Sequence, residues 1–432
     1  MNRSFYNGIS GIKTHQSGID IWGNNIANVN TVGYKANLPE FGSIFSQALY
    51  DGNSSPTDDQ IGLGSKLAAT AISMNQGTLQ QSDNALDLAI QGDGWFGVSG
   101  INNQQFFTRS GQFSTNAEGY VINGDGYFLL GTSAHNIGIM SDPENPQETI
   151  PFLSNSVESV DLTTPDAQER LQLPARMYYP PEPSTYAEFK ANLPVEYTPG
   201  QIYNIRAGLI APDGSQHTLT IAFSKSATQP PLGTAWTYHA YIDDVDNPSS
   251  VVDGALEFDE RGGLRTYPAT FTINNHGQAI SVTLGTSPYD GLVSIAGAEI
   301  APSSISDGFQ EGYLNGYRID QEANIVASFD NGRLSAIGKV AVFHFQNDQG
   351  LEKAGSNIFR PSANSGNAIF FKDATGSTVL GAHVINNALE NSNVSLATAL
   401  TELIVMQKAF DASAKSITTS DQMIQKAINM KK

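Results

Sequence analysis

The sequence contains no cysteine among its 432 residues, which excludes disulfide bonds, zinc–thiolate sites and thiol nucleophiles. No window approaches the roughly 18 apolar residues of a membrane-spanning helix. The N-terminal segment lacks the apolar core of a secretory signal peptide. Basic residues are also few, 23 against 42 acidic residues, giving a formal net charge of −19. Such a charge argues against binding nucleic acid or an anionic membrane surface.

The C-terminal residues 386–432 contain neither glycine nor proline, and their apolar side chains follow a heptad spacing. This pattern predicts one long helix with a seam along one side. Gln407 and Asp421 occupy the two polar positions of the seam. The apolar seam positions are Leu396, Leu400, Leu403, Phe410, Ala414, Ile417, Ile424 and Ile428. A seam of this length favours pairing with another helix over packing on the chain's own domain.

The N-terminal segment has the same heptad spacing of apolar residues, which predicts a second helix. This helix should end near residues 28–33, where Asn, Thr and Gly cluster. Ser4 is a candidate N-cap. The apolar seam positions are Phe5, Ile9, Ile12, Ile19 and Ile26. The helix also contains four glycines, each costing about 1 kcal/mol relative to alanine, so it needs packing for stability.

Ser4 and three of these glycines, Gly8, Gly11 and Gly18, share one stripe beside the apolar seam. A stripe of small residues lets another backbone approach closely. We therefore expect the segment to become ordered on binding; the alternative is a disordered tail in the free monomer.

The middle of the chain is rich in turns and alternating segments, which predicts antiparallel β structure. Residues 217–225 and 236–243 alternate strongly, and residues 328–345 contain an Asp-Asn-Gly hairpin signal. The predicted fold class is mainly β with terminal α-helices that pair as a coiled-coil layer. A discontinuous β domain follows, with an outer β domain inserted in it.

Pro-rich and acidic segments suggest where the domains meet. The predicted domains are 1–35 with 386–432 (helical), 36–75 (connecting segment, with a short helix within 41–50), 76–150 with 300–385 (inner β) and 151–299 (inserted outer β).

No catalytic, cofactor-binding or metal site is predicted. Residues 92–97 match G-x-G-x-x-G, but the next residues, 98–103, cannot open a helix well, so a core strand is the better interpretation. The seven histidines show no i, i+4 pair, and we expect them to occupy individual positions. Asp243, Asp244 and Asp246 lack the spacing of a calcium loop and are interpreted as a solvated turn.

Three blocks of the sequence resemble the bacterial flagellar rod and hook family. They lie at residues 24–35, 76–120 and 392–421. The residues that carry the resemblance include Asn24, Asn25, Asn28, Thr31, Gly33, Tyr34, Lys35, Gly77, Leu86, Asp87, Gly92, Gly94, Phe96, Ser392, Asn393 and Val394. Two positions depart from the pattern: Ser413 replaces the usual Asn, and Ala323 stands where a hairpin Gly is expected.

The resemblance implies a structural subunit that polymerises into a flexible helical tube and transmits torque from motor and rod to filament. Room for a large outer domain favours the hook over the distal rod. The implied location is the flagellum outside the cell, reached without a cleaved signal peptide. Implied partners are further copies of the chain, the rod, hook-cap and hook–filament junction proteins, and the export apparatus.

The predicted subunit interface consists of seam residues from both terminal helices. These are Phe5, Ile9, Ile12, Ile19, Ile26, Leu396, Leu400, Leu403, Phe410, Ile417 and Ile424. Two other classes stay open from the sequence: an extracellular β-rich binding module whose helices merely dimerise, and a β-sandwich hydrolase.

Overall fold

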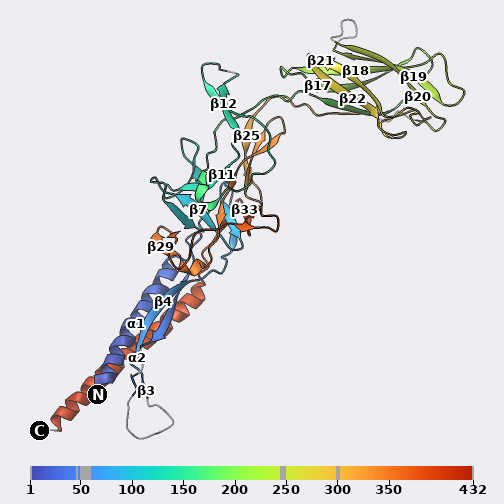
Figure 1. Cartoon of the computed structure of the whole chain (residues 1–432). Coiled ribbons are helices and arrows are strands. Elements are labelled where there is room, and N and C mark those ends of the chain that lie inside the picture. Colours follow the sequence, from blue (N-terminus) through green and yellow to red (C-terminus); the bar gives the residue numbers. More distant parts are fainter. Residues whose placement is uncertain are drawn as a thin grey trace.

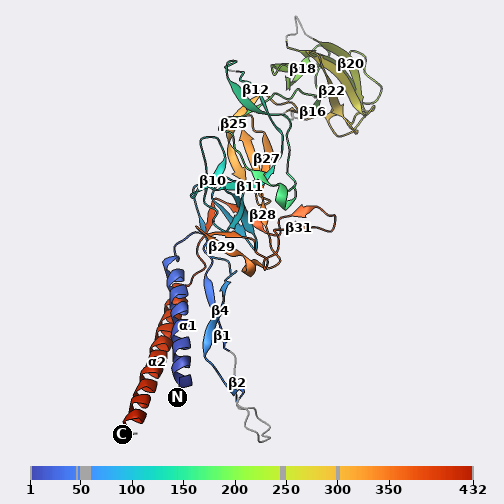
Figure 2. The ribbon, with the colours of Figure 1, turned by 60° about the vertical axis from the view of Figure 1, so that its left-hand side comes forward.

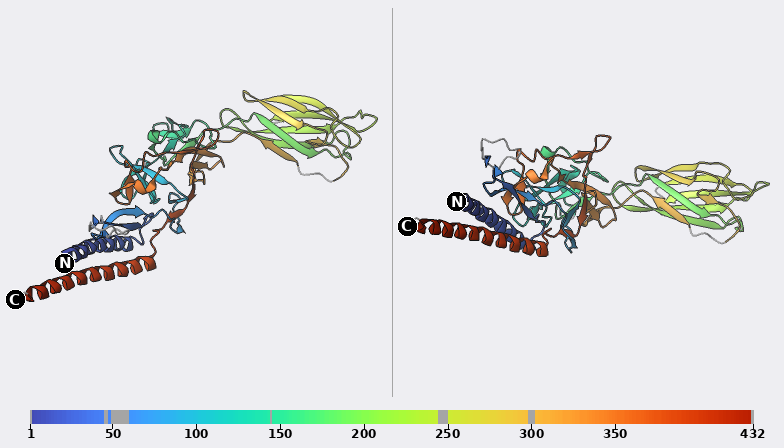
Figure 3. Two further views of the ribbon diagram at one scale, coloured as in Figure 1. Left: turned by 60° about the horizontal axis from the view of Figure 1, so that its bottom comes forward. Right: turned by 90° about the horizontal axis from the view of Figure 1, so that it is seen from below.

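The molecule is elongated, with both termini in a helical layer at one end and a β-sandwich at the other (Figure 1). The computed structural model describes residues 2–44, 47–48, 60–143, 145–243, 250–297 and 302–430. Helix α1 (Asn2–Ala27) and helix α2 (Leu396–Asn429) lie side by side. Two further views show the same succession of helices, inner β region and outer sandwich (Figure 3). The predicted fold class is confirmed.

The inner β region is built around one sheet of 15 strands. Its order is β12-β13-β15-β25-β26-β27-β11-β7-β8-β30-β29, with β9, β10, β14 and β28 attached at the side. The strands are β7 (Trp95–Ser99), β8 (Gln105–Thr108), β9 (Phe113–Thr115), β10 (Val121–Asn123), β11 (Phe128–Ser133), β12 (Ile137–Ser141), β13 (Thr149–Leu153), β14 (Glu169–Arg170), β15 (Tyr178–Tyr179), β25 (Gly312–Ile319), β26 (Asn324–Phe329), β27 (Leu334–Val340), β28 (Val342–Phe343), β29 (Glu352–Gly355) and β30 (Ile358–Arg360).

Short strand pairs join this sheet to its surroundings. All are antiparallel. They are β1 (Asn37–Ser43) with β4 (Ser65–Ile72), β2 (Gln47–Ala48) with β3 (Gln60–Ile61), β5 (Leu79–Gln81) with β34 (Ala388–Glu390), β6 (Leu88–Gln91) with β33 (His383–Asn386), and β31 (Phe371–Lys372) with β32 (Thr378–Val379). Two short 3-10 helices, η1 (Pro165–Ala167) and η2 (Asp348–Gly350), complete the region.

The G-x-G-x-x-G segment enters strand β7 rather than a helix, as predicted. Trp95 and Phe96 are fully buried in the inner core. A Cβ added at Gly97 would lie 2.2 Å from the ring of Phe343, so this glycine makes room for an aromatic side chain. The glycines of the segment therefore serve packing and turning, not a phosphate.

The outer region is a sandwich of two sheets around its own apolar core. One sheet has the order β17-β18-β19-β20, and the other is β21-β22-β16-β23 with β24 on β16. The strands are β16 (Tyr186–Asn192), β17 (Ile202–Ile210), β18 (Gln216–Lys225), β19 (Thr234–Ile242), β20 (Val251–Phe258), β21 (Ala269–Asn275), β22 (Gln278–Gly285), β23 (Leu292–Val293) and β24 (Ser303–Ser306). The two strongly alternating segments form strands β18 and β19, which pair with each other, and the predicted hairpin of β26 with β27 is confirmed.

Several predicted limits were wrong. Residues 383–390 form strands that pair with β6 and β5, so α2 begins at Leu396, with Ser395 as its N-cap. Residues 151–179, predicted in the outer domain, contribute to strands β13, β14 and β15 of the inner sheet, whereas β24, predicted in the inner domain, belongs to the outer sheet. Residues 41–43 continue strand β1 instead of forming a helix. Of the rest of that segment, residues 47–48 form strand β2 and residues 45–46 and 49–50 lie outside the described part, as do Asp244 and Asp246.

The structure tests two predictions about single residues, Ala323 and Ser4. Ala323 adopts φ +62° and is fully buried, so it occupies the left-handed conformation for which a glycine was expected. Ser4 is not an N-cap, because α1 already begins at Asn2. The Ser4 hydroxyl instead lies 3.0 Å from that of Ser420 on α2.

Candidate assembly interface

Helices α1 and α2 run antiparallel, and hairpin β1–β4 lies along α1 (Figure 2). Ser4 meets Ser420 near the start of α1, and Gly18 meets Met406 farther along. Thr14 attaches the hairpin to α1 by donating a hydrogen bond of 2.8 Å to the Ser65 carbonyl. The described part of the chain contains no helix that is long and apolar enough to cross a membrane.

The stripe of small residues on α1 is the surface that α2 approaches. A Cβ added at Gly8 would lie 2.6 Å from Ile417 Cγ1, and one at Gly11 would lie 2.7 Å from Ser413 Oγ. At Gly18 the nearest atom would be Met406 Sδ, at 3.0 Å. The prediction that this stripe admits another backbone is therefore confirmed within the chain.

The α2 side of this contact was missed by sequence reasoning. Met406, Ser413 and Ser420 recur every seven residues and face α1, whereas Gln407 and Asp421 are exposed. At the two polar positions of the predicted seam, the residue that faces α1 is therefore the preceding one: Met406 instead of Gln407, and Ser420 instead of Asp421. Ser413, which replaces the usual Asn of the family, belongs to this contact. Its side chain lies so close to Gly11 that a larger side chain would meet the glycine.

The predicted seam residues are only partly covered in one chain. Those that are half-buried are Ile9, Ile12, Ile19, Ile26, Leu403, Phe410, Ile417 and Ile424. Phe5, Leu396 and Leu400 are exposed at 36%, 46% and 45%. Of the described residues of α2, only Ala399 and Ser420 are buried. The large apolar side chains that α2 leaves exposed are Leu396, Leu400, Ile404, Val405, Met423, Ile428 and Met430.

Helix α2 is also the longer of the two, with 34 residues against 26. Because Ser420 lies opposite Ser4, the last turns of α2 extend past the start of α1, as the C-terminus in Figure 1 shows. Met423, Ile428 and Met430 are exposed on this overhang. A single chain therefore presents apolar surface along α2 and at its free end.

A buried charge cluster joins the helical end to the inner β region. Glu390 Oε1 accepts hydrogen bonds from Lys35 Nζ at 2.7 Å and from the Gly77 amide at 2.8 Å. Arg109 Nη1 lies 3.3 Å from Glu390 Oε2, and Arg109 Nη2 donates to the Gly92 carbonyl at 2.7 Å. All three charged side chains are only 1% exposed. Lys35, Gly77 and Gly92 were expected to matter through resemblance alone, and Arg109 lies within the resembling block 76–120. Glu390 was missed.

The charges in this cluster do not balance, since one carboxylate faces two cations. Burial lowers the pKa of Lys35, and Arg109 lowers it further, while Glu390 opposes both. Burial likewise lowers the pKa of Arg109, against the effect of Glu390. Glu390 is therefore the group that allows both cations to stay charged in this site.

We call the contact between the helical end and the inner β region the joint. The buried charge cluster is its first part, and asparagine side chains make its second part. Asn25 Nδ2 donates to the Asn37 carbonyl at 2.7 Å, and Asn25 Oδ1 accepts from the Asn37 amide at 2.9 Å and the Tyr34 hydroxyl at 3.2 Å. Asn393 Oδ1 accepts from the Ala36 amide at 2.7 Å. Its Nδ2 group donates to carbonyls of the segment before β5. Ser392 and Val394 flank Asn393 at the entry to α2.

Gly33 makes this turn possible. It adopts φ +66°, and an added Cβ would lie 2.4 Å from the Ser110 amide nitrogen. Its own amide donates to the Glu390 carbonyl at 2.7 Å. A side chain at this position would therefore separate α1 from the inner β region.

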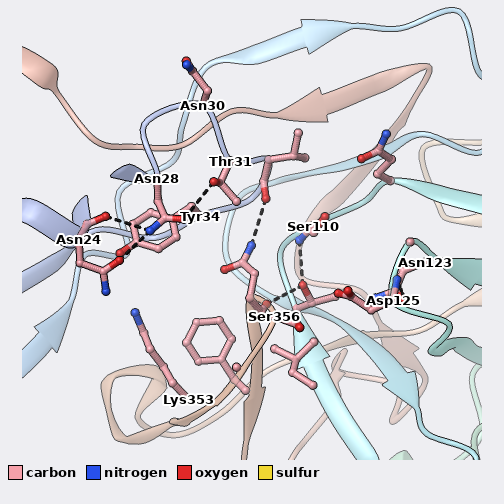
Figure 4. Close-up of a pocket in the computed structure, with 18 residues that line it drawn as sticks. Asn24, Asn28, Asn30, Thr31, Tyr34, Ser110, Asn123, Asp125, Lys353 and Ser356 are labelled. Atoms are coloured by element: carbon pink, nitrogen blue, oxygen red, sulfur yellow. Dashed lines mark hydrogen bonds between the residues drawn. The ribbon is translucent and has the colours of Figure 1, made fainter. Parts of the chain in front are cut away.

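Asn24, Asn28 and Thr31 form a hydrogen-bonded chain at the end of α1 and line a pocket of about 730 Å³ (Figure 4). Lys353 lies at the same pocket, its Nζ donating to Asn37 Oδ1 at 2.6 Å. Burial lowers the pKa of Lys353 to about 8.

The remaining signature residues lie in the inner β region, away from the helix contact. Asp87 accepts from Ser82 at 2.5 Å and from Asn84 at 3.1 Å, beside Leu86. Gly94 adopts φ +137° ahead of Phe96. The residues that carry the family resemblance therefore fall into two groups: one in the joint, and one in the inner β region around strand β7.

The sequence matches known proteins over its full length. Residues 385–430 match the family described as flagellar basal body rod FlgEFG protein C-terminal, 89–163 the flagellar hook protein FlgE/F/G D1 domain, and 5–35 the flagella basal body rod protein family. The flagellar hook protein FlgE of Borreliella burgdorferi is 30% identical over 469 aligned residues, covering 100% of both chains. The chain belongs to the flagellar hook protein family.

Other members of the family agree in length. The FlgE proteins of Escherichia coli and Salmonella typhimurium are 24% and 26% identical, each across 99% of this chain and 100% of their own. The crystal structure of Helicobacter pylori flagellar hook protein FlgE2 aligns with a TM-score of 0.52 at 15% identity. It covers 72% of this chain and 100% of its own, and supports the fold alone. This hook-family chain is a structural subunit of the flagellar hook and not an enzyme.

Proposed function

We propose that the chain polymerises through its terminal helices into a flexible helical tube that transmits torque from motor and rod to filament. The observation that carries this proposal is the exposure of large apolar side chains along α2 and on its overhang. A helix in a monomeric protein normally buries such a face. The seam residues named above would complete their burial against neighbouring copies.

The energetics favour repeated contacts of this kind. Full burial of one large apolar side chain contributes about 1.5–3 kcal/mol, so several half-covered residues together can offset the loss of freedom on association. The faces of α1 and α2 differ, so each copy would use different surfaces toward its two neighbours. Such heterologous contacts extend into a helix when they do not close into a ring.

The β regions would make weaker contacts at larger radius. The net charge of −19 disfavours tight packing between identical outer domains, which would let neighbours slide as the tube bends. We propose the helical end, the inner β region and the outer sandwich as separate folding units, because the two β regions have separate apolar cores. Residues 36–75 would connect the first two units.

The finer partners follow from this role. We propose rod, hook-cap and hook–filament junction proteins as contacts at the ends of the tube. Export without a cleaved signal by the flagellar export apparatus is part of the same proposal. A chain without cysteine needs no disulfide formation after export.

Electron microscopy of the purified full chain at high concentration tests the proposal. The full chain should form tubes. A chain trimmed of residues 2–27 and 396–430 should stay monomeric with folded β regions. This cut retains Lys35 and Glu390, so the buried charge cluster survives.

Point variants sharpen the test. Ile404 is 54% exposed, so Ile404→Asp should leave the monomer folded and abolish tubes. Leu403→Asp should do the same at a half-buried position, and Thr401→Asp controls for the added charge at an exposed polar site. Normal tubes from Ile404→Asp and Leu403→Asp would reject the helices as the polymer contact. Small closed oligomers from both full and trimmed chains would favour a binding module instead.

A further inference from the structure

Three potential metal ligands from three different elements meet at one end of the outer sandwich. His217 lies at the start of β18, Asp243 directly follows β19, and His276 occupies the turn between β21 and β22. His217 Nδ1 is 2.9 Å and 3.0 Å from the two carboxylate oxygens of Asp243. His276 Nε2 is 3.3 Å from Asp243 Oδ2. The donor atoms of all three residues lie within 4.8 Å of one another.

A hydrogen-bond chain fixes the orientation of the His217 ring. The Ser215 hydroxyl donates to Asp213 Oδ1 at 2.5 Å, and Ser215 Oγ lies 2.8 Å from His217 Nε2. The Nε2 edge of the ring is therefore held by Ser215, and its Nδ1 faces Asp243.

This orientation brings a ring nitrogen and a carboxylate together. His217 Nδ1 and Asp243 Oδ1 are 2.9 Å apart, so either a proton or a cation lies between them. The His–Ser–Asp chain is the kind of outer support that orients a metal-ligating imidazole.

The spacing fits an ion. A tetrahedral ion with bonds of about 2.0–2.1 Å keeps its ligand atoms about 3.3 Å apart. Asp243 Oδ2 lies 3.0 Å from His217 Nδ1 and 3.3 Å from His276 Nε2, close to this value. The two imidazole rings are stacked with their centroids 3.9 Å apart, so each would tilt to aim its lone pair at the shared ion. Two imidazoles and one carboxylate select a borderline transition ion such as Zn²⁺ over Ca²⁺ or Mg²⁺.

We propose that His217, Asp243 and His276 form a site for a divalent transition ion, with Zn²⁺ as the fitting chemistry, and that the ion clips the two sheets of the outer sandwich together. His217 and Asp243 belong to the four-stranded sheet and His276 to the other. The site lies at the end where the chain enters from the inner region, since Leu209 pairs with His217 and the Ser184 amide donates to the neighbouring Ile210 carbonyl. The clip would do for this cysteine-free domain what a disulfide does elsewhere.

The test uses the tag-free full chain at a concentration below that of polymer formation. Zn²⁺ titration by calorimetry should show about one site per chain, and Co²⁺ should give the intense visible bands of a tetrahedral complex that Zn²⁺ displaces. Saturating Zn²⁺ should raise the unfolding midpoint reported by Trp236, which is buried in the outer core, by about 5 °C. Ca²⁺ should do neither.

Variants locate the ion. His217→Gln and His276→Gln should each weaken Zn²⁺ binding at least about tenfold. His239→Gln is the matched control. His239 on β19 lies 2.5 Å from one carboxylate, Asp253 on β20, and no third potential ligand joins this pair among the described residues. Its Zn²⁺ affinity should equal that of the unmodified chain. Circular dichroism establishes that each variant is folded.

Two outcomes overturn the proposal. Absence of Zn²⁺ binding and of Co²⁺ bands in the unmodified chain would mean that His217, Asp243 and His276 form a hydrogen-bonded cluster that holds no ion. Undiminished binding in both site variants would place the ion elsewhere. The spectroscopic arm needs no variant, so a variant that fails to fold cannot rescue the idea.

Discussion

At the scale of single residues, the Lys35–Glu390–Arg109 cluster is the contact on which the joint depends. Its members are fully buried: Lys35 lies in the segment between α1 and β1, Arg109 directly follows β8, and Glu390 ends β34. The charge of Glu390 is shared between two cations, whereas each cation has neutral partners as well. The consequences of removing each member therefore differ.

Glu390→Gln should lower the free energy of unfolding of the inner region by about 3–5 kcal/mol, because two buried cations lose the carboxylate that both of them contact. Lys35→Met should cost less, about 1–3 kcal/mol, since Glu390 keeps Arg109 and the Gly77 amide. Urea unfolding followed by Trp95 fluorescence, in a background where Trp22 and Trp236 are phenylalanine, reports this region. Equal costs for the two variants would contradict the central role of Glu390.

At the scale of elements, the pairing of α1 with α2 depends on glycines that a helix would otherwise avoid. Each glycine lowers the intrinsic helix stability of α1 by about 1 kcal/mol. Gly8, Gly11 and Gly18 compensate by letting α2 approach closely, whereas Gly23 has no atom within 4 Å of an added Cβ. Gly23 therefore serves as the control for substitutions at the three contact glycines of the same helix.

Gly8→Ala should weaken the helix pair, because the new methyl group would lie 2.6 Å from Ile417 Cγ1 and 3.2 Å from the Ser413 carbonyl oxygen. Overpacking costs about 1–3 kcal/mol, which outweighs the gain in helix propensity. Gly23→Ala should stabilise the pair by up to about 1 kcal/mol. Thermal unfolding of the helices by circular dichroism, with sedimentation of polymer, compares the two. A Gly8→Ala variant as stable as Gly23→Ala would refute the close approach.

The sequence predicted these elements better than their contacts. The seven-residue period identified both helices, and the glycine stripe identified the face of α1 that α2 approaches. The facing residues of α2 were missed because a shift of one position, from Gln407 to Met406, rotates a helix face by about 100°. No local pattern reports that Lys35 will meet Glu390, 355 residues away.

The domain limits failed for a related reason. Proline-rich acidic segments between residues 140 and 185 resemble linkers, yet they carry Leu153, Leu171 and Met177 into the inner core. Buried positions spaced irregularly among prolines leave no periodic signal. The cluster at His217 was likewise invisible, because its three ligands come from separate strands and a turn.

At the scale of the whole molecule, the chain keeps a stable contact within itself and leaves another surface for its neighbours. The antiparallel contact ends where Ser4 meets Ser420, and α2 continues to Asn429. The turns beyond Ser420 contribute little to the single chain, since Met423, Ile428 and Met430 are exposed. Their apolar character fits the proposed contact with a neighbouring copy.

A chain that ends at Ser420 should therefore unfold at the same temperature as the full chain and fail to form long tubes. The monomer loses only exposed or half-buried side chains, so calorimetry at low concentration should show matching midpoints. Electron microscopy at high concentration should show tubes from the full chain alone. A full-length variant with Met423, Ile428 and Met430 replaced by glutamine separates the apolar contact from helix length, and it should also fail. Long tubes from either variant would mean that the overhang is not an assembly surface and that the exposed residues nearer Leu400 suffice.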